Sequence, residues 1–585
     1  MENNENLSLA NKASSMKMLM WAFIILAGFS AYLSFILAQQ RGTVFYIGFA
    51  LLIPFGALIL FFRRRMLAYR ALYVIKSSWG KKIERKRNFK DIRKLHEFLR
   101  AEKPEEFFID NQTWEDLTMD KVFEKLDRTL STAGEQALYH ILRSPKFNDD
   151  ALENRNKIIK LFEDNKNLRE KIQIELYWLG RQSKNTISDF LWGKLPPKSN
   201  ITILFNIMAL LPAILLVLIP FYGLQLVVYI VFVFMANMVI HSKFRSRINQ
   251  HIDSMTYLSA AVNTAKKLSN LDNTDLEGFT NVFNKDTKGI KASKNAALIG
   301  AVEGIDLVTD YFNILFLIKE RKFYAVLEEL VKHREELQRV YTSLGELDAL
   351  IAVASYRSGL DHYIEPQLSK EGRFIAAKEL FHPLIDDPIP NSISIEEGGI
   401  VLTGSNMSGK STFLRTIGVN ALFAQTICTC LADSYSASYF KLLSSISPSD
   451  DLLVGKSYYL GEAEAVLRII KSCEEKVPSL CIIDEIFRGT NPVERISASA
   501  EILDYLINHN SLPIVATHDL ELTEIVDEAY ECYYFTEDVD DEGLKFDYLI
   551  RKGVSPTRNA IKLLKYLGYP KEIIDKTYER VEKLV

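Results

Sequence analysis

The sequence predicts a mainly helical protein that ends in an α/β domain with a largely parallel sheet and that carries two hairpins of membrane helices. Three observations support this fold class. Four apolar runs lack charge, long stretches repeat apolar residues at helical spacing, and short β-prone runs alternate with helical stretches after about residue 370. Of the 585 residues, 48% are hydrophobic, which excludes a wholly disordered chain. With 27 Gly and five Cys, collagen-like and disulfide-scaffold classes are excluded as well.

The uncharged apolar runs form two closely spaced pairs. The first pair covers residues 18–38 and 43–62, and the second covers residues 201–220 and 224–240. Each run is near the ~20 residues needed to cross the hydrocarbon of a bilayer. Buried core helices are the alternative, but they seldom lack every charge over this length. A signal peptide is disfavoured because a second apolar run follows the first at once. We therefore predict an integral membrane protein with four spans.

Basic residues lie outside both hairpins, whereas the turns inside them carry only Arg41 or no charge. The flanking residues are Lys12, Lys17, Arg63, Arg64, Arg65, Lys194, Lys198, Lys243, Arg245 and Arg247. Because positive residues stay on the cytoplasmic side, both termini and all large segments are predicted to be cytoplasmic. The five cysteines show no paired framework, which fits a reducing compartment.

Residues 63–104 are predicted to be a basic juxtamembrane linker. Between residues 63 and 103 there are fifteen Lys or Arg and four acidic residues, a net charge of +11. Three interpretations are open: a solvated helix face, attraction to anionic lipid headgroups, or attraction to nucleic-acid phosphates. Since the segment directly follows a membrane span, membrane lipids are the favoured partner.

The soluble segments differ in their apolar periodicity. Residues 105–190 and 250–358 repeat apolar positions at helical spacing, which predicts an all-α region. Beyond about residue 370, β-prone runs alternate with helical stretches, as in an α/β domain. The predicted strands are Ile393–Ile395, Ile400–Thr403, Leu480–Ile483 and Pro513–Ala516.

A phosphate-binding loop motif follows the apolar run that ends at Thr403. It consists of Gly404, Ser405, Asn406, Met407, Ser408, Gly409, Lys410, Ser411 and Thr412, and it opens a helix-like segment. Its glycines let backbone N–H groups turn toward phosphate oxygens, and the helix N-terminus adds its dipole. Lys410 can reach the β- and γ-phosphates, and Ser411 can supply a hydroxyl to Mg²⁺. The motif therefore predicts ATP and Mg²⁺ as cofactors.

Two further strand ends carry polar residues that complete such a site. The strand before Asp484 and Glu485 is wholly apolar. Asp484 is predicted to hold Mg²⁺ through water, and Glu485 to polarise the attacking water. His518 follows the next predicted strand, where it can contact the γ-phosphate or that water. We predict Glu485, His518 and Lys410 as the catalytic residues of ATP hydrolysis.

These motifs resemble the MutS family, the ATPases of DNA mismatch repair and their relatives. Residues 403–412 differ from the family's phosphate loop only at Ser405 and Ser408. Residues 484–490 resemble its Asp-Glu-Ile-Gly-Arg-Gly-Thr, with Phe487 in place of Gly, and residues 516–518 match its Ala-Thr-His. Residues 457–462 look like a divergent form of a segment that reaches the nucleotide of the other subunit. The resemblance implies that Ser457 and Glu462 contact the nucleotide bound by the other subunit of a homodimer. The tail at residues 568–584 resembles the helices that close the family's dimer.

The resemblance is weaker upstream and has clear departures. Residues 126–134, with residues 347–350 and the pair His382-Pro383, resemble the family's helical core and the approach to its ATPase domain. No counterpart of the family's mismatch-reading wedge precedes residue 105, where membrane runs and basic residues stand instead. The resemblance therefore implies that the ATPase is retained, that DNA is a possible partner, and that mismatch reading is missing.

The predicted organisation has six segments. These are an N-terminal membrane hairpin at 1–62, the basic linker at 63–104, a first helical-core segment at 105–200, a second hairpin at 201–240, a second helical-core or lever segment at 241–370, and a MutS-type ATPase domain with dimerisation helices at 371–585. The predicted function is a membrane-anchored MutS-family ATPase. The alternatives are ABC-like transport, a membrane-complex ATPase that does not act on DNA, and a membrane tether with a degenerate ATPase. No small-molecule substrate other than ATP is indicated.

Overall fold

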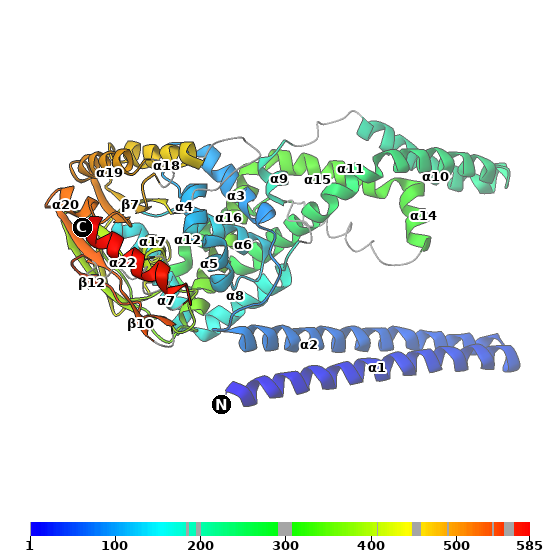
Figure 1. Ribbon diagram of the computed structural model, residues 1–585. Coiled ribbons are helices and arrows are strands. Elements are labelled where there is room, and N and C mark those ends of the chain that lie inside the picture. The colour runs from blue at the N-terminus through cyan, green and yellow to red at the C-terminus, as the bar shows by residue number, and fades with distance from the viewer. Residues whose placement is uncertain are drawn as a thin grey trace. The chain divides into compact units, whose positions relative to one another are not determined.

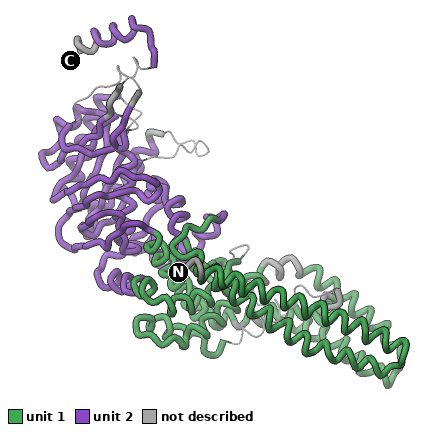
Figure 2. The backbone as a smooth tube through the Cα atoms, turned by 90° about the horizontal axis from the view of Figure 1, so that it is seen from below, with its two compact units in different colours: residues 1–84, 128–135, 160–359 green, residues 85–127, 136–159, 360–585 purple. Residues whose placement is uncertain are grey.

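The computed structural model describes residues 2–182, 187–194, 201–290, 307–405, 408–446, 458–487, 491–540, 543–554 and 567–584. The chain forms two compact units, which Figure 2 colours separately. Unit 1 consists of residues 1–84, 128–135 and 160–359, and unit 2 of residues 85–127, 136–159 and 360–585. Every strand of the described residues belongs to unit 2.

Two long helical hairpins belong to unit 1 (Figure 1). The first joins α1 (Glu2–Arg41) through a 3₁₀ turn (Thr43–Leu51) to α2 (Leu52–Ser78), and the second joins α10 (Ile201–Tyr222) to α11 (Leu226–Leu268). Four described helical stretches, at 5–41, 43–78, 202–222 and 226–244, are long and apolar enough to cross a membrane. The helices extend beyond the predicted runs, because α2 continues to Ser78 and α11 to Leu268. The predicted linker thus begins as a helix.

The rest of the described part of unit 1 is mainly helical, as the periodicity predicted. Its described helices are α8 (Lys166–Leu179), α9 (Ile187–Trp192), the short η2 (Thr274–Leu276), α12 (Glu277–Asp286), α14 (Leu307–Phe316), α15 (Ile318–Lys332) and α16 (Arg334–Arg357). The helix α16 is the centre of this packing, since nearly all of its residues after Gly345 are buried.

A buried carboxylate on α16 joins two segments that are far apart in the sequence. Asp348 accepts hydrogen bonds from the backbone N–H of Leu130 (3.0 Å) and of Ser131 (2.8 Å), and from the Ser131 hydroxyl (2.5 Å). Burial raises the pKa of Asp348 to about 6, although these donors act in the opposite direction. The two segments that carried the weaker upstream resemblance therefore meet in space.

We expect Gly134→Ala to destabilise unit 1. An added Cβ would lie 2.1 Å from Oδ2 of Asp348 and 2.6 Å from its Cβ, and the bonded carboxylate has no room to move. Overpacking of a closed site costs about 1–3 kcal/mol. Thermal unfolding of the detergent-solubilised protein measures this cost. Gly278→Ala is the control, because no atom lies within 4 Å of its added Cβ. Equal unfolding midpoints for both variants would contradict the expectation.

Unit 2 contains a six-stranded sheet in the order β12-β9-β4-β8-β7-β6. Its strands are β4 (Gly399–Thr403), β6 (Lys441–Ser445), β7 (Ser479–Asp484), β8 (Ser511–Ala516), β9 (Tyr530–Tyr534) and β12 (Arg551–Lys552). All neighbouring pairs are parallel except β12 with β9. The prediction of a largely parallel sheet is confirmed, and β4, β7 and β8 coincide with three of the four predicted strands.

The fourth predicted strand lies in a second, mainly antiparallel sheet that the sequence did not predict. This sheet has the order β1-β5-β2-β3 and consists of β1 (Gln367–Ser369), β2 (Phe374–Leu380), β3 (Asn391–Glu396) and β5 (Ser434–Ser438). A separate hairpin pairs β10 (Glu537–Asp540) with β11 (Gly543–Phe546).

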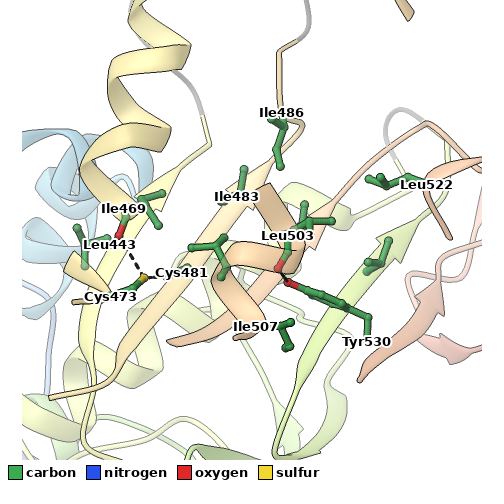
Figure 3. Packing of buried hydrophobic residues seen from close by; sticks show 13 residues of the cluster. Leu443, Ile469, Cys473, Cys481, Ile483, Ile486, Leu503, Ile507, Leu522 and Tyr530 are labelled. Atoms are coloured by element: carbon green, nitrogen blue, oxygen red, sulfur yellow. Dashed lines mark hydrogen bonds between the residues drawn. The ribbon is translucent and has the colours of Figure 1, made fainter. Parts of the chain in front are cut away.

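Helices α18 (Tyr458–Ser472) and α19 (Pro492–Ile507) pack on the parallel sheet around a buried apolar core (Figure 3). Ile469 and Leu503 from these helices meet Ile483 and Val515 from β7 and β8. The Tyr530 hydroxyl donates to the Leu503 carbonyl at 2.8 Å, which satisfies the one polar group of that side chain. This core fixes the strands whose carboxyl ends carry the polar residues.

Unit 2 also includes helices from the first third of the chain. They are α3 (Phe89–Glu102), α4 (Asn111–Asp116), α5 (Met119–Leu126) and portions of α6 (Thr132–Arg143) and α7 (Asp149–Asp164). Buried Asp116 accepts from the Ser444 hydroxyl at 2.7 Å and from the Ile446 N–H at 3.0 Å, next to β6. The compact units therefore divide residues 105–200, which the sequence predicted as one segment. Arg85 and Arg87 of the basic segment pair with buried Asp127, so some of its charge is neutralised.

Candidate functional site

A strand, a glycine-bounded loop and a helix follow one another at residues 399–426. The strand β4 ends at Thr403, and α17 (Lys410–Thr426) begins directly after Gly409. Gly404 and Gly409 have φ values of 142° and 113°, which side chains rarely adopt. A Cβ on Gly404 would lie 2.8 Å from the Phe535 carbonyl oxygen. Glycine is therefore required at both ends of the loop. Asn406 and Met407 lie outside the described residues.

Lys410 lies at the start of α17 with its amine turned back onto the loop. Its Nζ donates to the carbonyl oxygens of Gly404 and Ser405, each at 2.7 Å, and lies 3.4 Å from Nε2 of His518. The residue is only 5% exposed. A buried ammonium group satisfied by neutral carbonyls can exchange them for anionic oxygens, which form stronger hydrogen bonds.

Ser411 and Asp484 come from neighbouring elements and meet directly. The Ser411 hydroxyl donates to Oδ2 of Asp484 at 2.5 Å, and Asp484 ends β7 with 6% exposure. A hydroxyl and a carboxylate are hard oxygen ligands of the kind that Mg²⁺ takes, with waters and phosphate oxygens for the other positions. The two predicted metal residues thus fit that ion. Among the described residues there is no cluster of three or more His, Cys, Asp or Glu able to hold a metal by itself.

Glu485 and His518 lie side by side at the carboxyl ends of β7 and β8. Oε1 of Glu485 is 3.0 Å from Nε2 of His518. Glu485 has a φ of 63°, in the left-handed region that is uncommon for a residue with a side chain. Its N–H still donates to the Ala516 carbonyl at 2.9 Å, so the backbone turns only after the strand pairing ends. This turn sets the direction of the carboxylate.

An ion pair that the sequence did not predict fixes the segment after β8. Arg495 on α19 donates to both carboxylate oxygens of Asp519, at 2.8 and 2.5 Å. The Asp519 N–H donates to the Thr517 hydroxyl at 3.0 Å, and the Thr517 N–H donates to the Leu402 carbonyl at 2.9 Å. Both neighbours of His518 are thereby held. No sequence motif connects Arg495 with Asp519, although an acidic residue directly after the histidine was visible.

A cavity of about 270 Å³ lies beside the first turns of α17. Gly409, Phe413 and Tyr548 contribute to its wall, together with residues of the segment 380–391. Asn391 holds the Tyr548 segment, because its Nδ2 donates to the Tyr548 carbonyl at 2.9 Å. Burial lowers the pKa of His382, another lining residue, to about 4, so its imidazole is neutral near pH 7. Sequence reasoning missed this cavity because its wall comes from distant segments.

The described portion of the chain brings most predicted site residues together. Lys410, Ser411, Asp484, Glu485 and His518 are connected by the contacts above. Ser408 lies within the loop, where its hydroxyl donates to the Ser405 carbonyl at 2.9 Å, and Thr412 lines the cavity. Glu462 is buried in the second turn of α18. Ser457 and residues 488–490 lie outside the described residues.

Comparison with known proteins matches residues 400–585 to the family model of MutS domain V. The DNA mismatch repair protein MutS of Thermotoga petrophila is 32% identical over 276 residues, which cover 46% of this chain and 34% of that relative. The protein of the same name from Fusobacterium nucleatum is 28% identical over 274 residues, covering 45% and 30%. The DNA mismatch repair protein MSH3 of Vanderwaltozyma polyspora is 27% identical over 288 residues, covering 46% and 28%. The chain thus spans about a third of the length of these relatives.

Proposed function

The chain belongs to the MutS family through its domain V, and we propose that it is a membrane-anchored ATPase that uses Mg²⁺ and works as a homodimer. The observation that carries the proposal is the meeting of Lys410, the Ser411–Asp484 pair and the Glu485–His518 pair at the carboxyl ends of adjacent strands. In open α/β sheets, ligands bind at that edge. A membrane tether with a degenerate ATPase, or a purely structural domain, would not require these charged and polar side chains to lie together at one edge of the sheet.

Each residue has a distinct role in the proposed reaction. Lys410 exchanges its two carbonyl partners for β- and γ-phosphate oxygens, while the loop N–H groups and the α17 N-terminus bind the phosphates. Ser411 and Asp484 would hold Mg²⁺, and the ion would supply positive charge against the phosphates. Glu485 orients and polarises the attacking water, and His518 contacts the same water or the γ-phosphate. Arg495 and Asp519 keep His518 in place.

We assign the nucleoside base to the cavity beside α17. Phe413 and Tyr548 offer aromatic side chains there, which are common in the walls of small-molecule pockets, and Gly409 belongs both to the cavity wall and to the loop. A Cβ on Gly409 would lie 3.3 Å from the Tyr548 ring, so the loop and the cavity wall are in close contact.

The membrane anchor predicts how the protein fractionates. The four helical stretches that could cross a membrane are at most 17% buried over their apolar windows, so their surfaces need lipid or detergent. We expect the full chain to stay in the membrane pellet after alkaline carbonate and after high salt, and to be released only by detergent. Release of the chain by carbonate would contradict the anchor while leaving the ATPase proposal standing.

The proposed polymer is DNA, bound without mismatch reading. The relatives are named as DNA mismatch repair proteins, but the matched region covers only about a third of them. We expect DNA affinity to fall steeply with salt and to be equal for a perfect duplex and one with a single G·T mismatch. Titration of the detergent-solubilised protein with both duplexes, with and without ATP, measures this. A tenfold preference for the mismatch, about 1.4 kcal/mol, would contradict it.

A further inference from the structure

A groove of about 770 Å³ lies in unit 1, between the start of α10 and the amphipathic helix α15. None of the residues that line this groove belongs to the proposed ATP site, whose residues are in unit 2. Thr202 and Asn206 of α10 line one side. The other side comes from α15, and both helices pack against α11 within the same unit (Figure 1).

Adjacent residues of α15 hold it against the two helices of the second hairpin. Glu320, which is buried, lies 2.7 Å from Nδ1 of His241 on α11. Arg321 donates from Nε to Oδ1 of Asn206 on α10 at 2.8 Å. Glu320 thus binds α11, and its neighbour Arg321 binds α10. The two contacts hold α15 in place beside α10, so both walls of the groove are fixed.

The lining combines cationic and apolar groups. Arg321, Lys322 and Lys332 contribute positive charge, against one carboxylate from Glu328. The apolar lining comes from Ile318, Tyr324, Ala325, Leu327 and Val331. A small inorganic anion would bind the cationic side chains and leave the apolar side chains exposed to water. An amphipathic anion would contact both the cationic and the apolar side chains.

The level of the groove along α10 decides which amphipathic anion fits. Arg321 contacts Asn206, one turn inside the stretch 202–222 that is long and apolar enough to cross a membrane. At 1.5 Å per residue, Asn206 lies roughly 6 Å along the helix from Thr202, so the groove would lie near the boundary between the hydrocarbon and the lipid headgroups. Next to these residues, Ile203, Leu204 and Ile207 are exposed apolar side chains. An acyl chain can lie on them while its headgroup occupies the groove.

We propose that this groove binds one anionic glycerophospholipid of the leaflet at the N-terminal end of α10, with its phosphate at Arg321 and Lys322. The proposal rests on the membrane anchor proposed above. The bound lipid would join α15 to the hairpin and so connect the membrane with the helical unit. The excess of cationic over acidic lining residues selects against zwitterionic lipids, whose own cation would face Arg321 and Lys322.

The test is native mass spectrometry of the delipidated full chain after titration with phosphatidylglycerol or phosphatidylcholine. We expect one phosphatidylglycerol to be retained preferentially. Lys322→Gln should weaken its retention about fivefold, since one cation near an anionic lipid contributes about that factor. Lys319→Gln is the matched control, because Lys319 lies on the same helix but outside the groove lining. Lys322→Gln also leaves the Arg321–Asn206 contact intact, and the unfolding midpoint reports whether the variant folds.

Three results would overturn the lipid site. They are equal retention of the two lipids, equal losses in Lys322→Gln and Lys319→Gln, and displacement of the lipid by inorganic phosphate at millimolar concentration, which would indicate a free-anion site instead. Carbonate extraction of membranes that contain the same chain, done before solubilisation, keeps the two proposals apart. A chain that resists extraction yet shows no lipid preference refutes the groove assignment alone, whereas an extracted chain refutes the anchor.

Discussion

Replacing Glu485 by glutamine is expected to slow ATP hydrolysis by about 10²-fold or more while leaving nucleotide binding close to that of the parent protein. The carboxylate lies at the end of β7, 3.0 Å from Nε2 of His518, on a backbone with a φ of 63°. Glutamine keeps the size and one oxygen but cannot accept a proton near neutral pH. The loss should therefore appear in kcat, because the proposed role of Glu485 is to act on the attacking water.

Steady-state turnover and binding of a fluorescent ATP analogue, both in detergent, separate these effects. Glu494→Gln is the matched control, since that carboxylate is exposed in the first turn of α19. Turnover of Glu485→Gln equal to the parent would remove Glu485 from the proposed role. A parallel loss of binding would indicate that the substitution disturbed the β7 turn.

Lys410→Ala should weaken nucleotide binding and turnover together. Hydrogen bonds to charged groups are worth about 1.5–3 kcal/mol, which corresponds to roughly 10–150-fold in affinity. Lys410 is 5% exposed, and its amine already faces the carbonyls of the loop, where the phosphates would bind. The same binding and turnover measurements apply. Lys471→Ala, at the end of α18 and exposed, is the control. Unchanged affinity in Lys410→Ala would refute phosphate binding by this lysine.

The Lys410→Ala protein also tests the proposed homodimer. Ser457 lies outside the described residues, and its role across subunits comes only from the resemblance. Mixing Lys410→Ala subunits with Ser457→Ala subunits should restore some of the hydrolysis, because one of the two composite sites then has both residues. Strictly additive residual rates would contradict sharing across the dimer.

The sequence predicted those elements whose position depends on a run of neighbouring residues. The four long apolar helices, the strands β4, β7 and β8, and the loop before Lys410 were all predicted at close to their observed positions. Their ends were less predictable. The helix α2 continues through Arg63–Arg65 to Ser78, because helical hydrogen bonding does not end where hydrophobicity ends.

Contacts between residues far apart in the sequence could be identified only from the tertiary structure. Asp484 and Ala516 are register partners across β7 and β8, and this pairing brings Glu485 to His518. The sequence proposed these residues as one site because each follows a predicted strand, but it gave no contact between them. The Arg495–Asp519 pair and the cavity wall at Tyr548 had no motif at all. Sheet order and register decide such contacts, and neither follows from the periodicity of one segment.

The sequence by itself determined the long helical segments, the strands β4, β7 and β8, the glycine-bounded loop before Lys410 and the apolar character of the two hairpins. Only the tertiary structure showed that Asp348 accepts a hydrogen bond from Ser131 and that Asp116, on the early helix α4, accepts one from Ser444 of β6. It also showed the cationic groove between α15 and α10. The physical reason is that local propensity and hydropathy depend on neighbouring residues. Buried polar contacts between distant segments depend on which partner satisfies each donor and acceptor once the chain has packed.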